Sequence, residues 1–118
     1  MGGVDFIKDD ELLGNPTYSR PQERVREYKK AAENVFEMTG HCVKYFFNVT
    51  SGAGEILENV KRVEEAGADG IMVNFAAVGY SILKLVAENT RLPILGHAAG
   101  SGMVYEGTLK GMASPLAV

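Results

Sequence analysis

The residues best suited to chemistry stand together near the amino end of the chain, where Lys8, Asp9, Asp10 and Glu11 follow a short apolar stretch. Residues 4–7 are predicted to form a strand, and side-chain alternation then places Lys8 and Asp10 on one face, with Glu11 just beyond, where the chain turns. Neighbouring carboxylates are suitable ligands for a hard divalent cation such as Mg²⁺. A lysine would join them as a ligand only if it lost its positive charge, for example by reacting with CO₂ to form an anionic carbamate.

Acidic residues after a strand also have a simpler interpretation, in which they cap a helix or solvate a loop. The residue types alone leave both interpretations open. The stretch GGVDFIKDDE and the Arg-Pro helix start after it closely resemble the metal-binding segment of the RuBisCO large-subunit superfamily, which includes the RuBisCO-like proteins. The resemblance implies that Lys8 is carbamylated and that Asp10 and Glu11 complete a Mg²⁺ site. It also implies that Lys8, Asp9, Asp10 and Glu11 face the substrate, with Lys8 among the catalytic residues.

His97 is the second candidate, in the stretch LGHAAGSG. A lone histidine is as often a structural hydrogen-bonding residue, but here it resembles the family's active-site histidine, which lies near the carbon skeleton of the substrate. The resemblance therefore implies a substrate-binding and catalytic role, through a hydrogen bond to a hydroxyl or through proton transfer. True RuBisCO follows this histidine with an arginine that holds a phosphate, whereas this chain has Ala98. The difference favours a RuBisCO-like protein. His41 matches no family role and is expected at the opposite end of the barrel.

Asn48 and Asn74 follow apolar stretches and are predicted to stand at strand ends, more as structural hydrogen-bonding residues than as substrate ligands. Gly96, Gly100 and Gly102 would let backbone amides approach an anion, although a mobile loop explains them equally well.

The composition describes an ordinary soluble domain of 118 residues, 46% hydrophobic and 23% charged, with a net charge of −3. That charge offers no basic face for nucleic acid. No apolar run approaches the roughly 20 residues that span a bilayer, and no signal-peptide pattern is present, so we expect a cytoplasmic protein without membrane partners. The single cysteine, Cys42, is predicted to be buried as a small hydrophobic residue.

Strands and helices are predicted to alternate along the chain. The predicted strands are residues 4–7, 43–50, 70–74 and 93–97, with Phe46, Val49, Met72 and Ile94 among their core side chains. The predicted helices run from a Ser19 cap to Gly40, from Glu55 to Gly67, from Tyr80 to Asn89, and onward from Ser114-Pro115. In the first helix, Glu23, Arg24, Glu27 and Lys30 are expected to form a solvated face.

This alternation predicts a parallel sheet covered by helices, as a doubly wound sheet or a TIM barrel. No GxGxxG motif follows the first strand, and the polar residues at strand ends favour the barrel. A complete barrel has eight strands, and four are predicted here. We therefore expect an α/β fold, a partial TIM (β/α)8 barrel of about four β-α units. By resemblance these are family strands two to five, and residues 1–118 are a fragment of the C-terminal catalytic barrel domain. A fragment, a partial gene product and a self-associating piece all remain open.

The resemblance implies Mg²⁺-dependent enolisation of a small phosphorylated ketose-like substrate, with an enolase, isomerase or decarboxylase (lyase) outcome. The full-length parent is expected to be a homodimer, and the isolated segment to be inactive, because the base and the closing loop of the family lie outside it. Two alternatives stay open: a segment of a true ribulose-bisphosphate carboxylase, and a non-catalytic barrel fragment or assembly module with a vestigial metal site.

Overall fold

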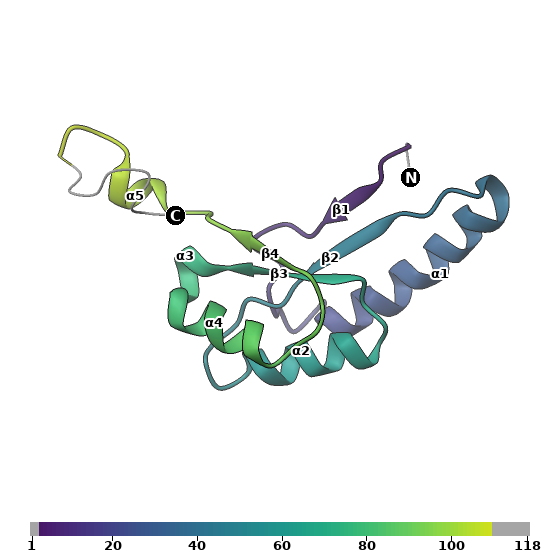
Figure 1. The fold of residues 1–118 in the computed structure, drawn as a ribbon, viewed down its shortest axis with the longest axis horizontal. Coiled ribbons are helices and arrows are strands. Elements are labelled where there is room, and N and C mark those ends of the chain that lie inside the picture. The colour runs from purple at the N-terminus through teal and green to yellow at the C-terminus, as the bar shows by residue number, and fades with distance from the viewer. Residues whose placement is uncertain (1–2, 110–118) are drawn as a thin grey trace.

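The computed structural model describes residues 3–109 and shows a four-stranded parallel sheet with helices packed against one face (Figure 1). The strands are β1 (Phe6–Lys8), β2 (Lys44–Asn48), β3 (Gly70–Asn74) and β4 (Ile94–His97). The helices are α1 (Pro21–Thr39), α2 (Ile56–Glu65), α3 (Phe75–Val78), α4 (Tyr80–Glu88) and α5 (Gly102–Tyr105). The strands pair in the order β1-β2-β3-β4, each beside the next along the chain. Parallel strands that pair in the order of the sequence form a section of a (β/α)8 barrel, so the predicted fold class is confirmed.

Helix α1, the longest, has clear start and stop signals. Pro21 occupies its first turn, where the fixed φ of proline suits a helix and no backbone donor is lost. The residue before it, Arg20, is the N-cap, and its backbone N–H donates to Glu23 Oε2 at 3.4 Å. The predicted cap, Ser19, was therefore wrong by one residue. The helix ends as predicted at Gly40, whose φ of +68° is a conformation that favours glycine.

The hydrophobic core lies between the sheet and the helices that cover it. Phe47 and Ile71 are register partners in neighbouring strands, and both are fully buried. Val25 of α1 and Val60 and Val63 of α2 pack in the same cluster with at most 1% of their surface exposed. Burial of apolar surface holds the helices on this face and orients each strand, because a one-residue slip would turn every side chain over.

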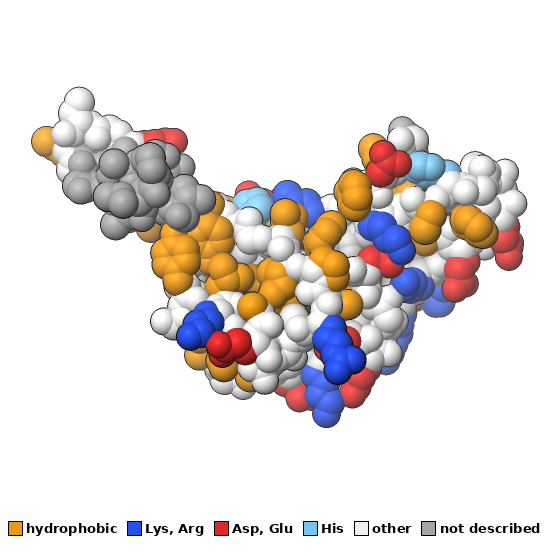
Figure 2. Space-filling model, viewed as in Figure 1, with side chains coloured by type: hydrophobic (Ala, Val, Ile, Leu, Met, Phe, Trp, Pro, Cys, Tyr) orange, Lys and Arg blue, Asp and Glu red, His pale blue; other side chains and the backbone are white. Residues whose placement is uncertain are grey.

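The opposite face of the sheet has no helix of the described residues against it. The register pairs Lys8 with Phe46 and Asn74 with His97, so these four side chains lie on this open face. Phe6 lies there too, with its ring centroid 6.4 Å from that of Phe46, and it is 68% exposed. Figure 2 shows hydrophobic side chains reaching the surface near β1 and β4, whereas charged side chains gather over the helices. In a complete barrel the open face would be the interior.

Several predictions at the level of elements need correction. The short helices α3 and α5 were not among the predicted elements, and β1, β2 and β4 are shorter than expected. Cys42 is exposed and not buried; it lies in the segment between α1 and β2. The helix predicted from Ser114-Pro115 lies outside the described residues. Within residues 3–109, no helix has the length and apolar character needed to cross a membrane.

Candidate metal centre and active site

Lys8 and Glu11 meet at the carboxyl end of β1, where Lys8 Nζ lies 3.6 Å from Glu11 Oε2. The two side chains are 40% and 39% exposed, so this pair contributes little to stability and leaves both groups accessible. Lys8 Nζ also donates to the Asp9 carbonyl oxygen at 3.1 Å. Asp10 is exposed, and its Oδ1 accepts the Leu12 backbone N–H at 2.8 Å, which turns the chain directly after the strand. The ligand roles of these side chains remain predictions.

The side chains at this strand end provide one anionic group too few to hold a metal ion. The part of the chain that the structure describes has no group of three or more His, Cys, Asp or Glu side chains placed to hold a metal ion. Asp10 and Glu11 supply two carboxylates, and the third neighbour is the amine of Lys8. A carbamate on that amine would supply the missing anionic oxygen, and three such ligands with water suit Mg²⁺. The residues therefore fit the ion in the carbamylated form of Lys8.

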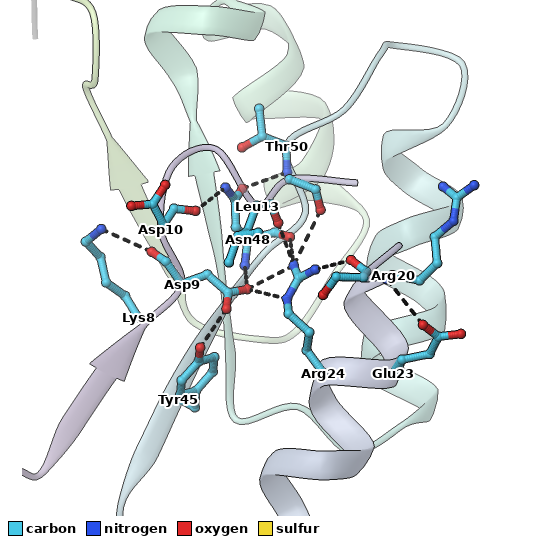
Figure 3. Close-up of polar contacts among 12 residues, drawn as sticks. Lys8, Asp9, Asp10, Leu13, Arg20, Glu23, Arg24, Tyr45, Asn48 and Thr50 are labelled. Carbon is cyan, nitrogen blue, oxygen red and sulfur yellow. Dashed lines mark hydrogen bonds and ion pairs between the residues drawn. The ribbon is translucent and has the colours of Figure 1, made fainter. Parts of the chain in front are cut away.

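Asp9 points away from Lys8 and Asp10, toward the helices (Figure 3). It is 2% exposed, and its Oδ1 accepts the Tyr45 hydroxyl at 2.6 Å. Its Oδ2 accepts Arg24 Nε at 2.9 Å and the Asn48 backbone N–H at 2.8 Å. This placement does not support the substrate-contacting role predicted for Asp9, because both oxygens are buried and bound within the protein.

Arg24 is the cation of this buried network. Its side chain is 12% exposed, so the prediction that it belongs to a solvated face was wrong. Besides Asp9, the guanidinium donates to the carbonyl oxygens of Leu13 (2.7 Å), Ser19 (2.5 Å), Asn48 (2.9 Å) and Gly14 (3.4 Å). One side chain of α1 thereby holds the loop that follows β1 and the end of β2.

Asn48 is fully buried and connects β2 to the acidic loop. Its Nδ2 donates to the carbonyl oxygens of Asp10 at 3.0 Å and Glu11 at 3.1 Å, and its Oδ1 accepts the Thr50 N–H at 3.0 Å. These contacts agree with the structural role predicted for Asn48. They also hold the backbone of Asp10 and Glu11, two of the three residues predicted as metal ligands.

His97 and Asn74 lie side by side at the carboxyl ends of β4 and β3. His97 Nδ1 accepts the Ala99 N–H at 3.1 Å, so the neutral ring carries its proton on Nε2. Asn74 donates through Nδ2 to the Ala99 carbonyl oxygen at 3.2 Å, and its Oδ1 is buried with no hydrogen-bond partner among the described residues. His97 is half-buried, with one edge of its ring fixed by the loop after β4.

Side-chain pKa values are shifted at both ends of the sheet. Burial, the hydrogen bond to Asp9 and the negative charge of Asp9 raise the pKa of the Tyr45 phenol well above its usual value of 10.0. At the amino end, the hydrogen bond to Asp69 and the charge of Asp69 raise the pKa of Lys44. His41 also lies at the amino end, with Nε2 at 3.0 Å from the Val4 carbonyl oxygen, opposite to Lys8 as expected.

Comparison with known proteins agrees with this arrangement. Residues 1–116 match the family model of the ribulose bisphosphate carboxylase large chain, catalytic domain. The chain is 40% identical over 117 residues to a ribulose bisphosphate carboxylase-like protein of Archaeoglobus fulgidus, a match that covers 98% of this chain and 27% of that protein. It is 37% identical over 118 residues to the 2,3-diketo-5-methylthiopentyl-1-phosphate enolase of Bacillus thuringiensis, covering 98% of this chain and 28% of the enolase.

Solved structures show the same likeness. A rubisco-like protein (MtnW) from Alicyclobacillus acidocaldarius superposes with a TM-score of 0.88 at 35% identity, covering 98% of this chain and 30% of that one. A dimeric archaeal Rubisco from Hyperthermus butylicus gives a TM-score of 0.80 at 31% identity, covering 93% of this chain and 26% of that one. The chain thus spans less than a third of the length of these relatives. It belongs to the RuBisCO large-chain family, and its four strands are a section of the TIM barrel of that family's catalytic domain.

Proposed function

We propose that this chain is the metal-binding section of a RuBisCO-like enzyme that enolises a small phosphorylated ketose-like substrate with the help of Mg²⁺. In this proposal residues 1–118 are part of the C-terminal catalytic barrel domain, and the whole protein is cytoplasmic and dimeric. The observation that carries the proposal is the placement of Lys8 beside Glu11, with Asp10 between them in the chain, at the carboxyl end of β1. Active sites of TIM barrels lie at this end of the strands.

Lys8, Asp10 and Glu11 would hold the ion, with Lys8 as a CO₂-derived carbamate. When bound, Mg²⁺ supplies Lewis-acid stabilisation of the negative charge that develops on a substrate carbonyl oxygen as the neighbouring carbon loses its proton. The exposure of Lys8 supports this assignment, because CO₂ must reach an unprotonated amine. The weak pairing of that amine with Glu11 leaves it free to react.

His97 would contact the substrate through Nε2. Its Nδ1 is occupied as an acceptor of the Ala99 N–H, so the neutral ring presents a donor to the open face. A donor there suits a substrate hydroxyl or carbonyl oxygen, and His97 would also return a proton to carbon or oxygen if it became charged.

The relative named 2,3-diketo-5-methylthiopentyl-1-phosphate enolase supports an enolase outcome over carboxylation. Ala98 supports the same choice, because it has no charged group with which to hold the second phosphate of a bisphosphate. The isomerase and decarboxylase outcomes share the enolisation step and depend on residues outside this chain.

Titration of Mg²⁺ into the full-length parent protein, with and without bicarbonate, tests the proposal. We expect bicarbonate to tighten binding and Lys8→Ala to abolish that dependence. Lys44→Ala is the matched control, since Lys44 is an exposed lysine at the amino end of the neighbouring strand. Equal affinity with and without bicarbonate would contradict the carbamate and favour a vestigial site in a non-catalytic module.

A further inference from the structure

We propose that Asp9 and Arg24, with Asn48, are positioning residues that aim Lys8 and Asp10 at the open face of the sheet and so set the metal affinity of the site. We call these three residues the Arg24 anchor. The inference rests on the proposed function, in which Lys8, Asp10 and Glu11 are the metal ligands. It assigns a role to side chains that are not themselves ligands.

The first step of the argument is side-chain alternation. Along an extended chain, consecutive side chains point to opposite faces, so Asp9 on the helix side requires Lys8 and Asp10 to point to the open side. Asp9 is 2% exposed, whereas Lys8 and Asp10 are exposed. The Asp9 N–H extends the ladder by donating to the Phe46 carbonyl oxygen at 3.0 Å, so the alternation persists beyond the last residue of β1.

The second step is the charge of Asp9, which would be costly to bury alone. Arg24 provides the opposite charge at 2.9 Å from Asp9 Oδ2, and Tyr45 and the Asn48 N–H provide the other donors. A buried carboxylate with three donors has one favourable orientation. Any rotation of the strand end that brought Asp9 to the open face would leave the Arg24 charge buried without an anionic partner.

The third step is the loop that carries the ligands. Arg24 donates to carbonyl oxygens of Leu13 and Ser19, while Asn48 donates to those of Asp10 and Glu11. The backbone of both carboxylate ligands is therefore bonded to β2, and the turn after them is bonded to α1. A lysine at position 24 would keep one positive charge but lose the planar fork that reaches several acceptors at once.

The test combines Arg24→Lys with a control at another ion-paired site, Asp69→Asn. Asp69 has a 13% exposed side chain that pairs with Lys29 and Lys44 at the amino end of the sheet, far from the acidic loop. Three quantities are measured on each variant of the full-length parent protein: Mg²⁺ affinity in bicarbonate by calorimetry, the urea midpoint of unfolding, and hydrogen exchange of residues 9–14.

We expect Arg24→Lys to weaken Mg²⁺ binding about tenfold or more, the usual loss when groups outside the ligand set are changed. Hydrogen exchange in residues 9–14 should also become faster in Arg24→Lys. Asp69→Asn should change neither the Mg²⁺ affinity nor this exchange, even if it lowers the urea midpoint by the same amount. Unchanged affinity in Arg24→Lys overturns the proposal, as does a loss of affinity that follows the urea midpoint equally in both variants. If Arg24→Lys does not fold, Tyr45→Phe removes one donor to Asp9 and should weaken binding in the same direction, and unchanged binding overturns the proposal.

Failure of the proposed function would look different. If the protein without substitutions shows no bicarbonate-dependent Mg²⁺ binding, the ligand assignment is wrong. Hydrogen exchange alone then tests whether the Arg24 anchor holds the loop. Faster hydrogen exchange confined to residues 9–14 in Arg24→Lys would then support the claim that the Arg24 anchor fixes this loop. Unchanged exchange would overturn that claim.

Discussion

Asp9 shows how one buried side chain can decide what its neighbours do. It stands between two exposed residues, and its two oxygens accept three hydrogen bonds from groups on β2 and α1. Because hydrogen bonds to a charged group are stronger than those between neutral groups, removing any one donor should have a measurable effect on stability.

Tyr45→Phe is the least disruptive way to remove a donor. The raised pKa of Tyr45 means that the folded state holds the phenol proton more tightly than the unfolded state, whose phenols titrate near pH 10. Tyr45 therefore contributes stability in full below about pH 10, and that contribution is lost as the pH rises further. We expect Tyr45→Phe to lower the free energy of unfolding by about 1.5–3 kcal/mol at pH 8, and to make its decline above pH 10 less steep.

Urea unfolding followed by circular dichroism between pH 8 and pH 11 measures both effects. Tyr18→Phe is the control, because Tyr18 is 82% exposed. Some alkaline slope should persist in Tyr45→Phe, since burial also raises the pKa of Tyr28. An unchanged slope would show that the Tyr45 proton does not contribute to stability.

From the resemblance, the sequence predicts site roles for Lys8, Asp10, Glu11 and His97, and these roles stay predictions. The structural role predicted for Asn48 agrees with its contacts. The sequence pattern placed Asp9 with its neighbours and Arg24 on a solvated face, and both placements differ from the structure. The missed signal is available in the sequence: a carboxylate between two open-face residues must point to the helix side, where it needs a cation. Which residue of α1 would supply that cation depends on the packing of α1 on β2, a long-range contact that local patterns do not contain.

At the scale of elements, the loop between β1 and α1 is positioned by close contact with the end of β2. Gly14 is buried, and a Cβ atom built there would lie 2.1 Å from the Thr50 carbonyl oxygen. A backbone oxygen cannot move away as a flexible side chain can. The absence of a side chain at position 14 is therefore what lets the loop rest on the strand end within reach of Arg24.

Gly14→Ala should force the loop away from Thr50 and lower the free energy of unfolding by about 1–3 kcal/mol. Gly54→Ala is the matched control, because a Cβ atom there would meet nothing within 4 Å. The comparison of urea midpoints checks the prediction. Equal stability of the two variants would mean that the loop has room to shift without loss.

The main strands and helices were predictable because their patterns are local. Gly70–Asn74 of β3 was predicted with its observed bounds, since its apolar residues form a short run soon after the turn at Gly67. Helix α3 was missed because its four residues are too short for a helical period. It forms where the chain leaves β3 at Asn74, and Phe75 at its start is buried against the sheet.

At the scale of the whole molecule, the chain is more extended than a closed domain of its length. Its radius of gyration is 15.8 Å, with extents of 53 × 32 × 27 Å, whereas a compact domain of this size is expected near roughly 13–14 Å. The reason is visible in Figure 1, where α1, α2 and α4 lie on one side of the sheet and α5 extends beyond β4. Neither β1 nor β4 pairs with a second strand on its outer side within the described residues.

Such a half barrel leaves apolar surface and two strand edges unsatisfied. Phe6 is 68% and Val4 46% exposed at the β1 edge, and unpaired edges promote association between chains. At ~25 cal/mol per Å² of apolar surface, the interior that a complete barrel would bury is worth more than the ~5–15 kcal/mol by which domains are typically stable. We therefore expect the isolated 118-residue chain to self-associate or to lose cooperative unfolding.

Sedimentation velocity over a range of concentrations, together with urea unfolding, measures this directly. Phe6→Lys should shift the distribution toward smaller species, because a charged side chain on an edge strand opposes pairing. Met38→Lys is the control: Met38 is 79% exposed but belongs to α1 and not to a strand, and its replacement should leave the distribution unchanged. A monomer with one cooperative transition at every concentration would instead show that four β-α units fold alone. In that case the covered face of the sheet would supply enough buried surface to stabilise the open one.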